Sequence, residues 1–461
     1  MADERPPDRP VDSATPGARI SRRRVLATGA ATVLAGLGGA GSVAAVRDDT
    51  EESGKPSSKR PGKRPQIAAL VTEYRKYSHG QNIVDRFLGG YGWESRWHHP
   101  EMDVVALYVD QSPESDLSHE RVARYPQLKL YPTIAEALTQ GGDKLAVDGV
   151  LLIAEHGRYP KNEKGQTLWP RYEFFMQMVD VFRASGRSVP VFFDKHLSWK
   201  WDQAVEMVEL SRELGFPMLA GSSLPVCRRI PSLDLPWGAE VEEIVSVGVG
   251  DIDSYDIHSL EAMQCLVERR RGGETGVVWI EALRGDRVWK AFDSGSWQAG
   301  GWDPRLFEAC LCRSLSLQQA DETRRHAYPT REDLRKLVRE DPVAYRFEYA
   351  DGLRATMLLV GPLTHDITAA VRLKNESDPF SVLFYLGSGH DMQPNIFNPF
   401  SHHIETMIAS GRSPYPIERT LLTTGLTAAG VESLWQGQKR LETPHLAIRY
   451  QVGEQSTFRR T

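Results

Sequence analysis

The sequence predicts an α/β domain with an open parallel sheet, followed by an α+β domain with a large, open, mainly antiparallel sheet. The first observation is a strand–turn–helix–strand unit over residues 189–224. It begins with the apolar run Val189–Phe193, continues through the polar turn Asp194–His196, and then shows apolar residues at helical spacing until Gly215. The second observation is a change of pattern after Ser223, where strand-like runs follow one another between polar loops.

The composition is that of an ordinary globular protein. The chain has 461 residues, enough for roughly two or three domains, with 41% hydrophobic and 25% charged residues. A net charge of −5 gives no indication of a surface for nucleic acid. The cysteines form no C-x-x-C pair, so the sequence predicts buried free thiols and neither a disulfide framework nor a zinc site. They are Cys227, Cys265, Cys310 and Cys312.

The amino terminus resembles a twin-arginine signal. Ser21–Leu26 reads SRRRVL, and the apolar run Ala27–Ala45 that follows is interrupted by glycines, which argues against a membrane-spanning helix. We therefore expect residues 1–45 to be a signal peptide that engages the Tat translocase and directs export to the periplasm or another extracytoplasmic site. Residues 46–65 are charged and nearly free of apolar side chains, which predicts a disordered linker.

Apolar runs of the first domain alternate with helical patterns, as in β–α units. Besides the strands of the opening unit, near residues 189 and 218, we expect strands at Gln66–Val71, Val104–Val109, Leu128–Leu130 and Val147–Ala154. Glycines at 89, 90 and 92 predict the end of a helix after the first strand. A short helix over Thr133–Leu138 begins at a capping threonine, and a longer one is expected over Arg171–Ala184.

The second domain is expected to contain six strands and an early helix. The helix lies near residues 254–266 and carries His258 and Glu261. The expected strands are Val241–Val247, Val277–Leu283, Tyr345–Tyr349, Thr356–Val360, Ile367–Leu373 and Ser381–Leu386.

The stretch FFDKHLSWKWDQAVEMVELSRELGFPMLAGSSL resembles the E-K-P segment of the glucose–fructose oxidoreductase/inositol dehydrogenase (Gfo/Idh/MocA) family. Lys195 stands at the family's lysine, whereas Asp194 and His196 replace its glutamate and proline. The helix with His258 is similar to the family's D-x-x-x-H-x-x-D helix, although Ser254 stands where the first aspartate would be. The resemblance covers roughly residues 66–440 and is strongest over 147–224.

The resemblance implies a Rossmann-type NAD(P)-binding domain over 66–223. It also implies an α+β substrate and oligomerisation domain over 224–461, whose C-terminal helices return to the interdomain cleft. The implied function is an exported oxidoreductase that acts on a sugar, polyol or related carbohydrate-like compound with NAD or NADP. Whether the chain forms a homo-oligomer is left open by the sequence. In this interpretation Lys195 polarises the reacting oxygen and His258 exchanges its proton. Glu155 and His156, at the end of the strand over 147–154, are further candidates for acid–base catalysis.

The turn after the first strand departs from the family. The family has a glycine-rich turn there, which lets the backbone approach the pyrophosphate. In this chain only Gly80 lies in the right region, and Thr72–Tyr77 fill the turn. Arg75 and Lys76 are therefore candidate phosphate-binding residues, and Asp110, at the end of the second strand, is the candidate for the ribose. We expect dinucleotide binding to be weaker than in the family, or different.

Each candidate also has a structural interpretation that the sequence leaves open. Arg75 and Lys76 suit a solvated loop, and Asp110 suits a helix cap. Lys195 suits a stabilising ion pair with a nearby carboxylate, and His258 suits packing between the domains.

Two other functions also remain open. The same fold without a working dinucleotide site would bind carbohydrate, or catalyse a lyase or hydrolase reaction with Lys195, His196 and Glu155. The glycine-poor turn favours this alternative, whereas the retained Lys195 favours the oxidoreductase. A purely structural scaffold is the third possibility.

The histidines near the C-terminus do not predict a metal site. His402 and His403 are followed by Glu405, but this H-H-x-E pattern lacks the i, i+4 histidine spacing of helical zinc sites. We therefore expect no metal there, and the roles of these histidines and of His390 stay open.

Overall fold

The computed structural model describes residues 63–318, 331–338, 341–387 and 394–460. The expected signal peptide, most of the expected linker and His390 lie outside the described residues. Within the described ranges, we find no helix with both the length and the apolar character needed to cross a membrane.

The first sheet contains six parallel strands in the order β5–β4–β1–β6–β7–β8. The strands are β1 (Gln66–Val71), β4 (Asp103–Val109), β5 (Lys129–Leu130), β6 (Gly149–Ile153), β7 (Val191–Asp194) and β8 (Met218–Gly221). The order reverses between β1 and β6, which makes the sheet doubly wound, and ligands of such sheets bind at the carboxyl edge near this reversal. All five residues of β6 are buried because helices cover both faces of the sheet.

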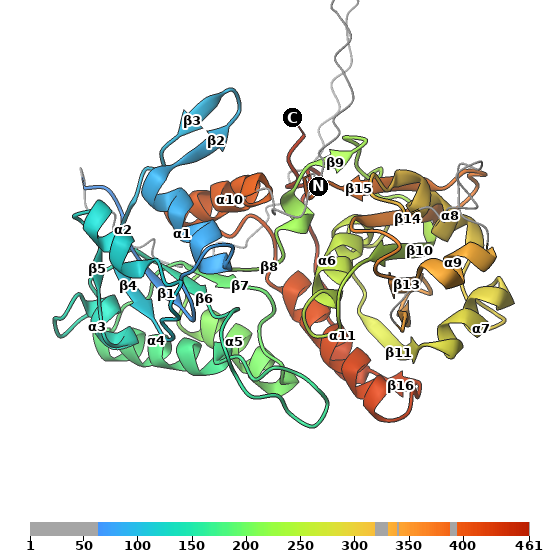
Figure 1. Cartoon of the computed structure of the whole chain (residues 1–461), viewed down its shortest axis with the longest axis horizontal. Helices are drawn as coiled ribbons and strands as arrows, with labels where there is room; N and C mark the ends of the chain where they lie inside the picture. Colours follow the sequence, from blue (N-terminus) through green and yellow to red (C-terminus); the bar gives the residue numbers. More distant parts are fainter. Residues whose placement is uncertain (1–62, 319–330, 339–340, 388–393, 461) are drawn as a thin grey trace, which may run out of the picture. The chain divides into compact units, whose positions relative to one another are not determined.

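Alternate residues of each strand face different helix layers. Ala68 and Leu70 of β1 pack into the cluster formed by α3 (Ile134–Thr139), α4 (Arg171–Ser185) and α5 (Trp201–Glu213). Ile67, Ala69 and Val71 pack into the other cluster, with α1 (His79–Gly89) and α10 (Phe397–Ser410). Figure 1 shows α10, near the C-terminus, beside α1 on this face. Ser78 caps α1, and Thr133 caps α3 as the sequence predicts. A short helix, α2 (Ser118–Arg124), precedes β5.

The second sheet has the order β16–β11–β12–β13–β10–β14–β15–β9 and contains all six expected strands. The strands are β9 (Arg229–Ile230), β10 (Val241–Gly248), β11 (Val277–Arg284), β12 (Val343–Tyr349), β13 (Arg354–Leu359), β14 (Ile367–Leu373), β15 (Phe380–Phe384) and β16 (Leu441–Glu442). Neighbouring strands are antiparallel except β10 and β13, which are parallel. The fold class predicted from the sequence is therefore confirmed.

Helices cover both faces of the second sheet. One hydrophobic cluster joins it to α6 (Asp256–Val267) and α11 (Glu418–Trp435), and the other joins it to α7 (Asp286–Ser294), α8 (Pro304–Arg313) and α9 (Arg331–Leu337). Short 3₁₀ helices are found at Leu224–Val226, Pro394–Ile396 and Pro444–Leu446. Because α6 carries His258 and follows β10, this layer brings His258 towards the carboxyl edge of the first sheet.

A two-stranded hairpin separates α1 from β4 and was not expected from the sequence. It consists of β2 (Tyr91–Trp93) and β3 (Arg96–His98). Asn398 of α10 donates a hydrogen bond to the carbonyl of Gly92 (2.9 Å) and accepts one from Arg86 of α1 (2.8 Å). The hairpin is thus held by residues that lie about 300 positions away in the sequence.

Candidate active site

Lys195 lies at the carboxyl end of β7, as the sequence predicts, and is almost completely buried. Its Nζ donates hydrogen bonds to Oε1 of Glu155 (2.6 Å) and to the backbone carbonyl of Ser254 (3.2 Å). The exposed fraction is 4% for Lys195 and 8% for Glu155. An ammonium group has three N–H donors, so these two contacts leave one for another acceptor.

Glu155 is held between two cations. Arg171, the first residue of α4, donates to Oε2 of Glu155 at 2.6 Å, while Lys195 occupies Oε1. Burial acts to raise the pKa of the Glu155 carboxyl, but Lys195 and Arg171 outweigh it and lower that pKa well below its usual range. Glu155 is therefore a carboxylate at neutral pH.

His196 extends this network away from Lys195. Nη1 of Arg171 lies 3.1 Å from Nε2 of His196, and a guanidinium only donates, so the imidazole accepts. Burial, reinforced by Arg171, lowers the pKa of His196 well below its usual range, so this ring is neutral. The same nitrogen, Nε2, also lies 3.8 Å from Oδ1 of Asp253, whose carboxylate accepts a hydrogen bond from Gln166 (3.2 Å).

His258 lies on α6 and is bonded to Ser222, just after β8. Nδ1 of His258 is 2.6 Å from Oγ of Ser222. Burial and then the charge of Lys195 lower the pKa of His258 well below its usual range. The sequence places both Lys195 and His258 at the site, and both lie at this edge. The lowered pKa leaves the ring neutral, so one ring nitrogen is free of a proton and can accept one, but as a weaker base than an exposed histidine.

Glu261 does not act as an acidic partner of His258. Its carboxylate is fully buried and accepts hydrogen bonds from the backbone N–H of Ser222 (2.6 Å) and from Thr420 (2.7 Å). A Cβ added to Gly221 would lie 2.4 Å from both Glu261 oxygens, so only glycine fits there. Burial raises the pKa of Glu261 to about 7. This residue supports the turn after β8.

Two further histidines lie where α1 begins. Nδ1 of His79 is 2.7 Å from Oδ2 of Asp194, and the rings of His79 and His156 are 5.2 Å apart. Burial lowers the pKa of His156 to about 3, so it is neutral. His156, predicted as an acid–base residue, therefore lies in contact with the start of α1, whereas His79 was not predicted.

The loop after β6 crosses the ends of β1 and β4. The backbone N–H of His156 donates to Oγ1 of Thr72 (3.2 Å), and that of Arg158 donates to Oε1 of Gln111 (2.9 Å). The hydroxyl of Tyr159 donates to Oδ2 of Asp110 at 2.6 Å. Asp110 lies at the predicted strand end, but Tyr159 occupies the carboxylate that a ribose would use.

The turn before α1 is also occupied by its own side chains. Nε of Arg75 is 2.7 Å from the carboxylate of Glu73, and Nζ of Lys76 lies 4.7 Å from the ring centroid of Tyr77. Oγ of Ser78 accepts from the N–H groups of Gln81 (3.1 Å) and Arg75 (3.2 Å), which removes two donors that a phosphate would use.

Gly80 has a packing role at the start of α1. A Cβ at this position would lie 2.7 Å from the carbonyl oxygen of Glu73, so glycine permits the helix to approach the turn. This is the part played by one glycine of the dinucleotide motif. The remaining features, namely the Glu73 carboxylate, the Ser78 cap and the Tyr159–Asp110 contact, do not fit an extended dinucleotide while residues 156–159 lie across the crevice.

Two of the cavities within the described residues have volumes of about 800 Å³ and 820 Å³. One, of about 820 Å³, is lined by Gln166, Lys164, Trp199, Trp201, Glu432 and His445 among others. Because Gln166 also donates to Asp253, this cavity adjoins the buried network. Its volume is in the range of small-molecule sites.

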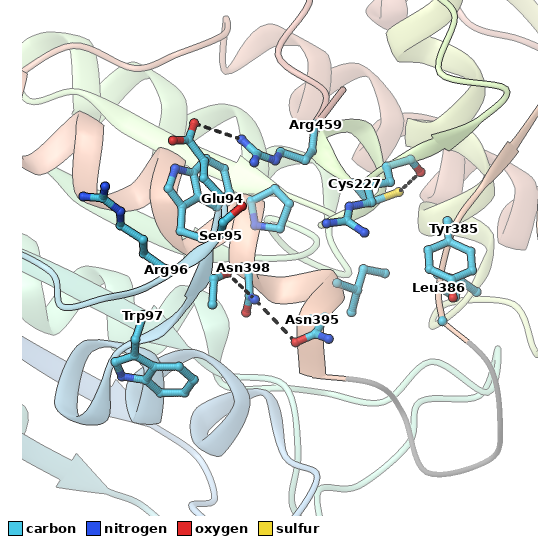
Figure 2. Close-up of a pocket in the computed structure, with 16 residues that line it drawn as sticks. Glu94, Ser95, Arg96, Trp97, Cys227, Tyr385, Leu386, Asn395, Asn398 and Arg459 are labelled. Atoms are coloured by element: carbon cyan, nitrogen blue, oxygen red, sulfur yellow. Dashed lines mark hydrogen bonds and ion pairs between the residues drawn. The ribbon is translucent and has the colours of Figure 1, made fainter. Parts of the chain in front are cut away.

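The other cavity, of about 800 Å³, lies under the hairpin (Figure 2). Among the residues that line it, Figure 2 shows Glu94 paired with Arg459, and Asn398 bonded to Asn395. None of the residues that we predicted for catalysis or cofactor binding lines this cavity.

Comparisons with known proteins show which solved structures share this fold. No protein-family model matches the sequence, and no curated protein matches it at a significant level. Among solved structures, the chain is similar to GenD2 from gentamicin A biosynthesis in complex with NAD, with a TM-score of 0.51 and 12% identity over 85% of this chain and 99% of that chain. The fold is that of the Gfo/Idh/MocA dehydrogenases. The resemblance predicted from the sequence is thereby confirmed at the level of the fold.

A second Gfo/Idh/MocA-type structure is more distant in shape. It is myo-inositol dehydrogenase from Lactobacillus casei in complex with NAD(H) and myo-inositol, with a TM-score of 0.49 and 13% identity over 82% of this chain and 97% of that chain. At such low identities the likeness to these structures shows the fold alone, so the chemistry must be argued from the residues of this chain.

Sequence reasoning missed Arg171, Asp253, Ser222 and His79 as members of the network. Arg171 carried a signal, because a cation in the first turn of a helix faces the positive end of the helix dipole and needs a carboxylate nearby. The other three come from the start of α1, the turn after β8 and the turn before α6, and no spacing in the sequence relates them to Lys195.

Proposed function

We propose that this chain is an enzyme that acts on a sugar, polyol or related polyhydroxylated compound by acid–base catalysis at Lys195 and His258. The observation that carries the proposal is the meeting of Lys195, Glu155 and His258 at the carboxyl edge of the doubly wound sheet. Lys195 is fixed by Glu155 and by the carbonyl of Ser254, four residues before His258 on the same segment.

The two residues have different roles in this proposal. Lys195 uses its remaining N–H donor to bind a substrate hydroxyl and to stabilise negative charge on its oxygen. His258 is neutral, and its Nδ1 is bonded to the hydroxyl of Ser222. Its other ring nitrogen, Nε2, therefore exchanges the proton of the substrate hydroxyl. Glu155 holds the ammonium group of Lys195 in position.

Oxidoreduction with NAD or NADP is the first candidate reaction, because the fold is shared with GenD2, whose structure contains NAD. A bound nicotinamide would accept a hydride from the substrate carbon. This reaction requires residues 156–159 to leave the crevice first, since Tyr159 holds Asp110.

A second candidate is favoured by that same contact. If the loop stays in place, the centre works without a dinucleotide, as a lyase or hydrolase or as a carbohydrate-binding protein, with Lys195, His196 and Glu155 as its polar groups. The internal pairing of Glu73 with Arg75 and the capping by Ser78 support this second candidate.

Calorimetric titration of NAD and NADP distinguishes the candidates. Tyr159→Phe removes only the hydroxyl that binds Oδ2 of Asp110 and leaves the contact of Tyr108 with Oδ1 (2.9 Å) in place, and Tyr172→Phe is the matched control, because the Tyr172 hydroxyl binds Glu206 on α5. For the oxidoreductase we expect binding that tightens severalfold in Tyr159→Phe and is unchanged in Tyr172→Phe. No binding to any of the three proteins, together with dinucleotide-free turnover of a sugar or polyol, selects the second candidate.

The proposal of an acid–base enzyme has its own test. A panel of sugars and polyols is assayed with and without dinucleotide. If no compound is turned over under either condition, and none binds, the proposed function is wrong.

We also propose that the chain is exported through the twin-arginine pathway. The support is the SRRRVL segment with the apolar run after it. This part of the chain lies outside the described residues, and the proposal rests on the sequence.

A further inference from the structure

Three potential metal ligands meet between the hairpin and α10, away from the site described above. One ligand atom from each of His98, His402 and Glu405 can be chosen so that all three lie within 4.8 Å of one another. His98 is the last residue of β3, whereas His402 and Glu405 lie one turn apart on α10. The sequence grouped His402 with His403, but His403 instead bonds to the carbonyl of Thr457 (2.8 Å).

The hydrogen bonds of His98 and Glu405 explain why these two residues lie together. Oε2 of Glu405 lies 2.7 Å from Nε2 of His98 and also accepts from the hydroxyl of Tyr91 (3.2 Å), while Oε1 accepts from the backbone N–H of Glu101 (2.8 Å). These contacts tie the hairpin and the segment after it to α10. A structural role therefore explains His98 and Glu405.

The same role does not explain His402. Nδ1 of His402 is buried and has no hydrogen-bond partner in the described structure. The ring is held in place by stacking on Trp93, with centroids 4.2 Å apart and planes 20° from parallel, and its centroid is 6.0 Å from that of His98. An imidazole nitrogen that is buried without a partner loses free energy, unless another group or an ion binds it.

We propose that His98, His402 and Glu405 bind one Zn²⁺ ion, with water as the fourth ligand. Two imidazoles and one carboxylate form a donor set that zinc accepts, at ligand distances of about 2.0–2.2 Å. Ligands at such distances in a tetrahedron are roughly 3.4 Å apart. The His98–Glu405 pair, at 2.7 Å, is closer than that, and all three ligand atoms lie within 4.8 Å of one another, so side-chain rotations have to adjust these separations.

The charges around the cluster permit the ion. Glu405 supplies one negative charge, and Arg459, which lies 4.1 Å from the ring centroid of Trp93, is paired with Glu94 at 3.7 Å. Figure 2 shows this pair at the rim of the cavity under the hairpin. Trp93 lines that cavity and stacks on His402, so the ion would fix one wall of the cavity.

The test compares His402→Gln with His403→Gln in the full folded chain. Each protein is stripped with a chelator, incubated with ZnCl₂ in tenfold excess, desalted and analysed for zinc by mass spectrometry. We expect one zinc per chain in the wild type and in His403→Gln, and a loss of at least tenfold in His402→Gln. His98→Gln, the second variant, should lose zinc in the same way.

Thermal melting provides a readout that does not depend on any activity. Zinc should raise the Tm of the wild type and of His403→Gln by about 2 °C or more, and leave that of His402→Gln unchanged. His402→Gln breaks no hydrogen bond of Nδ1 and loses only the ring stacking on Trp93, so its zinc-free Tm should lie at or slightly below that of the wild type, which shows that the variant folds. Absence of zinc in the loaded wild type, or equal zinc in His402→Gln, overturns the proposal. Neither outcome depends on the proposed function.

Discussion

Lys195 is the residue on which the proposed chemistry depends most. Lys195→Met keeps most of the aliphatic stem and removes the charge, while Glu155 retains Arg171 as a partner, so the fold should survive. Loss of a hydrogen bond to developing negative charge costs roughly 2.7–4 kcal/mol. We therefore expect turnover of a substrate from the sugar and polyol panel to fall by about two to three orders of magnitude.

Lys290→Met is the control for this experiment, because Lys290 is an exposed lysine of α7. It should keep wild-type turnover and wild-type Tm. If Lys195→Met lowers the Tm and leaves turnover unchanged, the pair with Glu155 is a structural ion pair, which the sequence also left open.

Glu261 should make stability depend on pH. Its pKa is raised from 4.5 to about 7 by burial. Between these values the unfolded chain has lost the proton and the native state keeps it, so the contribution of this group to stability is fully present below about pH 4.5 and is lost as the pH rises through 7.

Urea unfolding of the wild type and Glu261→Gln over this range measures the effect. The glutamine does not titrate, so the wild-type free energy of unfolding minus that of the variant should fall by about 3 kcal/mol between pH 4.5 and 7.5. Asp256, whose pKa is also raised to about 7, is present in both proteins and cancels in the difference. A difference that is constant with pH would show that Glu261 titrates normally.

At the scale of single elements, α11 is held close to the second sheet by a glycine. A Cβ added to Gly430 would lie 2.3–2.8 Å from three ring atoms of Tyr345, which is fully buried and bonded to Asp256. Alanine is favoured over glycine inside a helix by about 1 kcal/mol, but overpacking costs about 1–3 kcal/mol. We expect Gly430→Ala to destabilise the protein, as measured by urea unfolding.

A double-mutant cycle identifies the cause. In a Tyr345→Leu background the ring is absent, so the same Gly430→Ala change should cost less free energy than in the wild type. Equal costs in the two backgrounds would mean that the clash is relieved elsewhere.

The regular elements with long apolar runs could be predicted from the sequence. The strand expected at Gln66–Val71 is observed with the same bounds, and the expected Ile367–Leu373 strand is likewise unchanged. Such strands are buried on both faces or alternate strictly, so local pattern determines them. The hairpin of β2 and β3 escaped prediction, because each strand has only three residues and Trp97 is 63% exposed.

The hairpin also shows why long-range contacts limit such predictions. Its stability comes from Glu405 and Asn398, which bond to His98 and Gly92 from positions more than 300 residues later. The candidate site follows the same rule. Lys195 was found because it ends a strand, whereas the Tyr159–Asp110 contact joins two loops that no periodicity relates.

At the scale of the whole molecule, export of the folded chain is testable through its amino terminus. Replacing Arg22 and Arg23 together by lysine should keep the protein in the cytoplasm at precursor size, because the twin-arginine machinery reads that pair. Cell fractionation and immunoblotting measure the outcome. Correct processing and unchanged location of the double variant would rule out this route.

If the chain is the proposed oxidoreductase, residues 156–159, whose Tyr159 donates a hydrogen bond to Asp110, also lower its affinity for the dinucleotide by keeping most molecules closed. In that proposal a dinucleotide would bind only those molecules in which these residues have moved away, so the apparent dissociation constant would equal the intrinsic one divided by the fraction of open molecules. With about one molecule in a hundred open, binding is about a hundredfold weaker than the crevice itself would allow. Weak binding by this chain would then measure how rarely the crevice opens, and a substrate that stabilises the open form would appear as a cooperative partner of the dinucleotide.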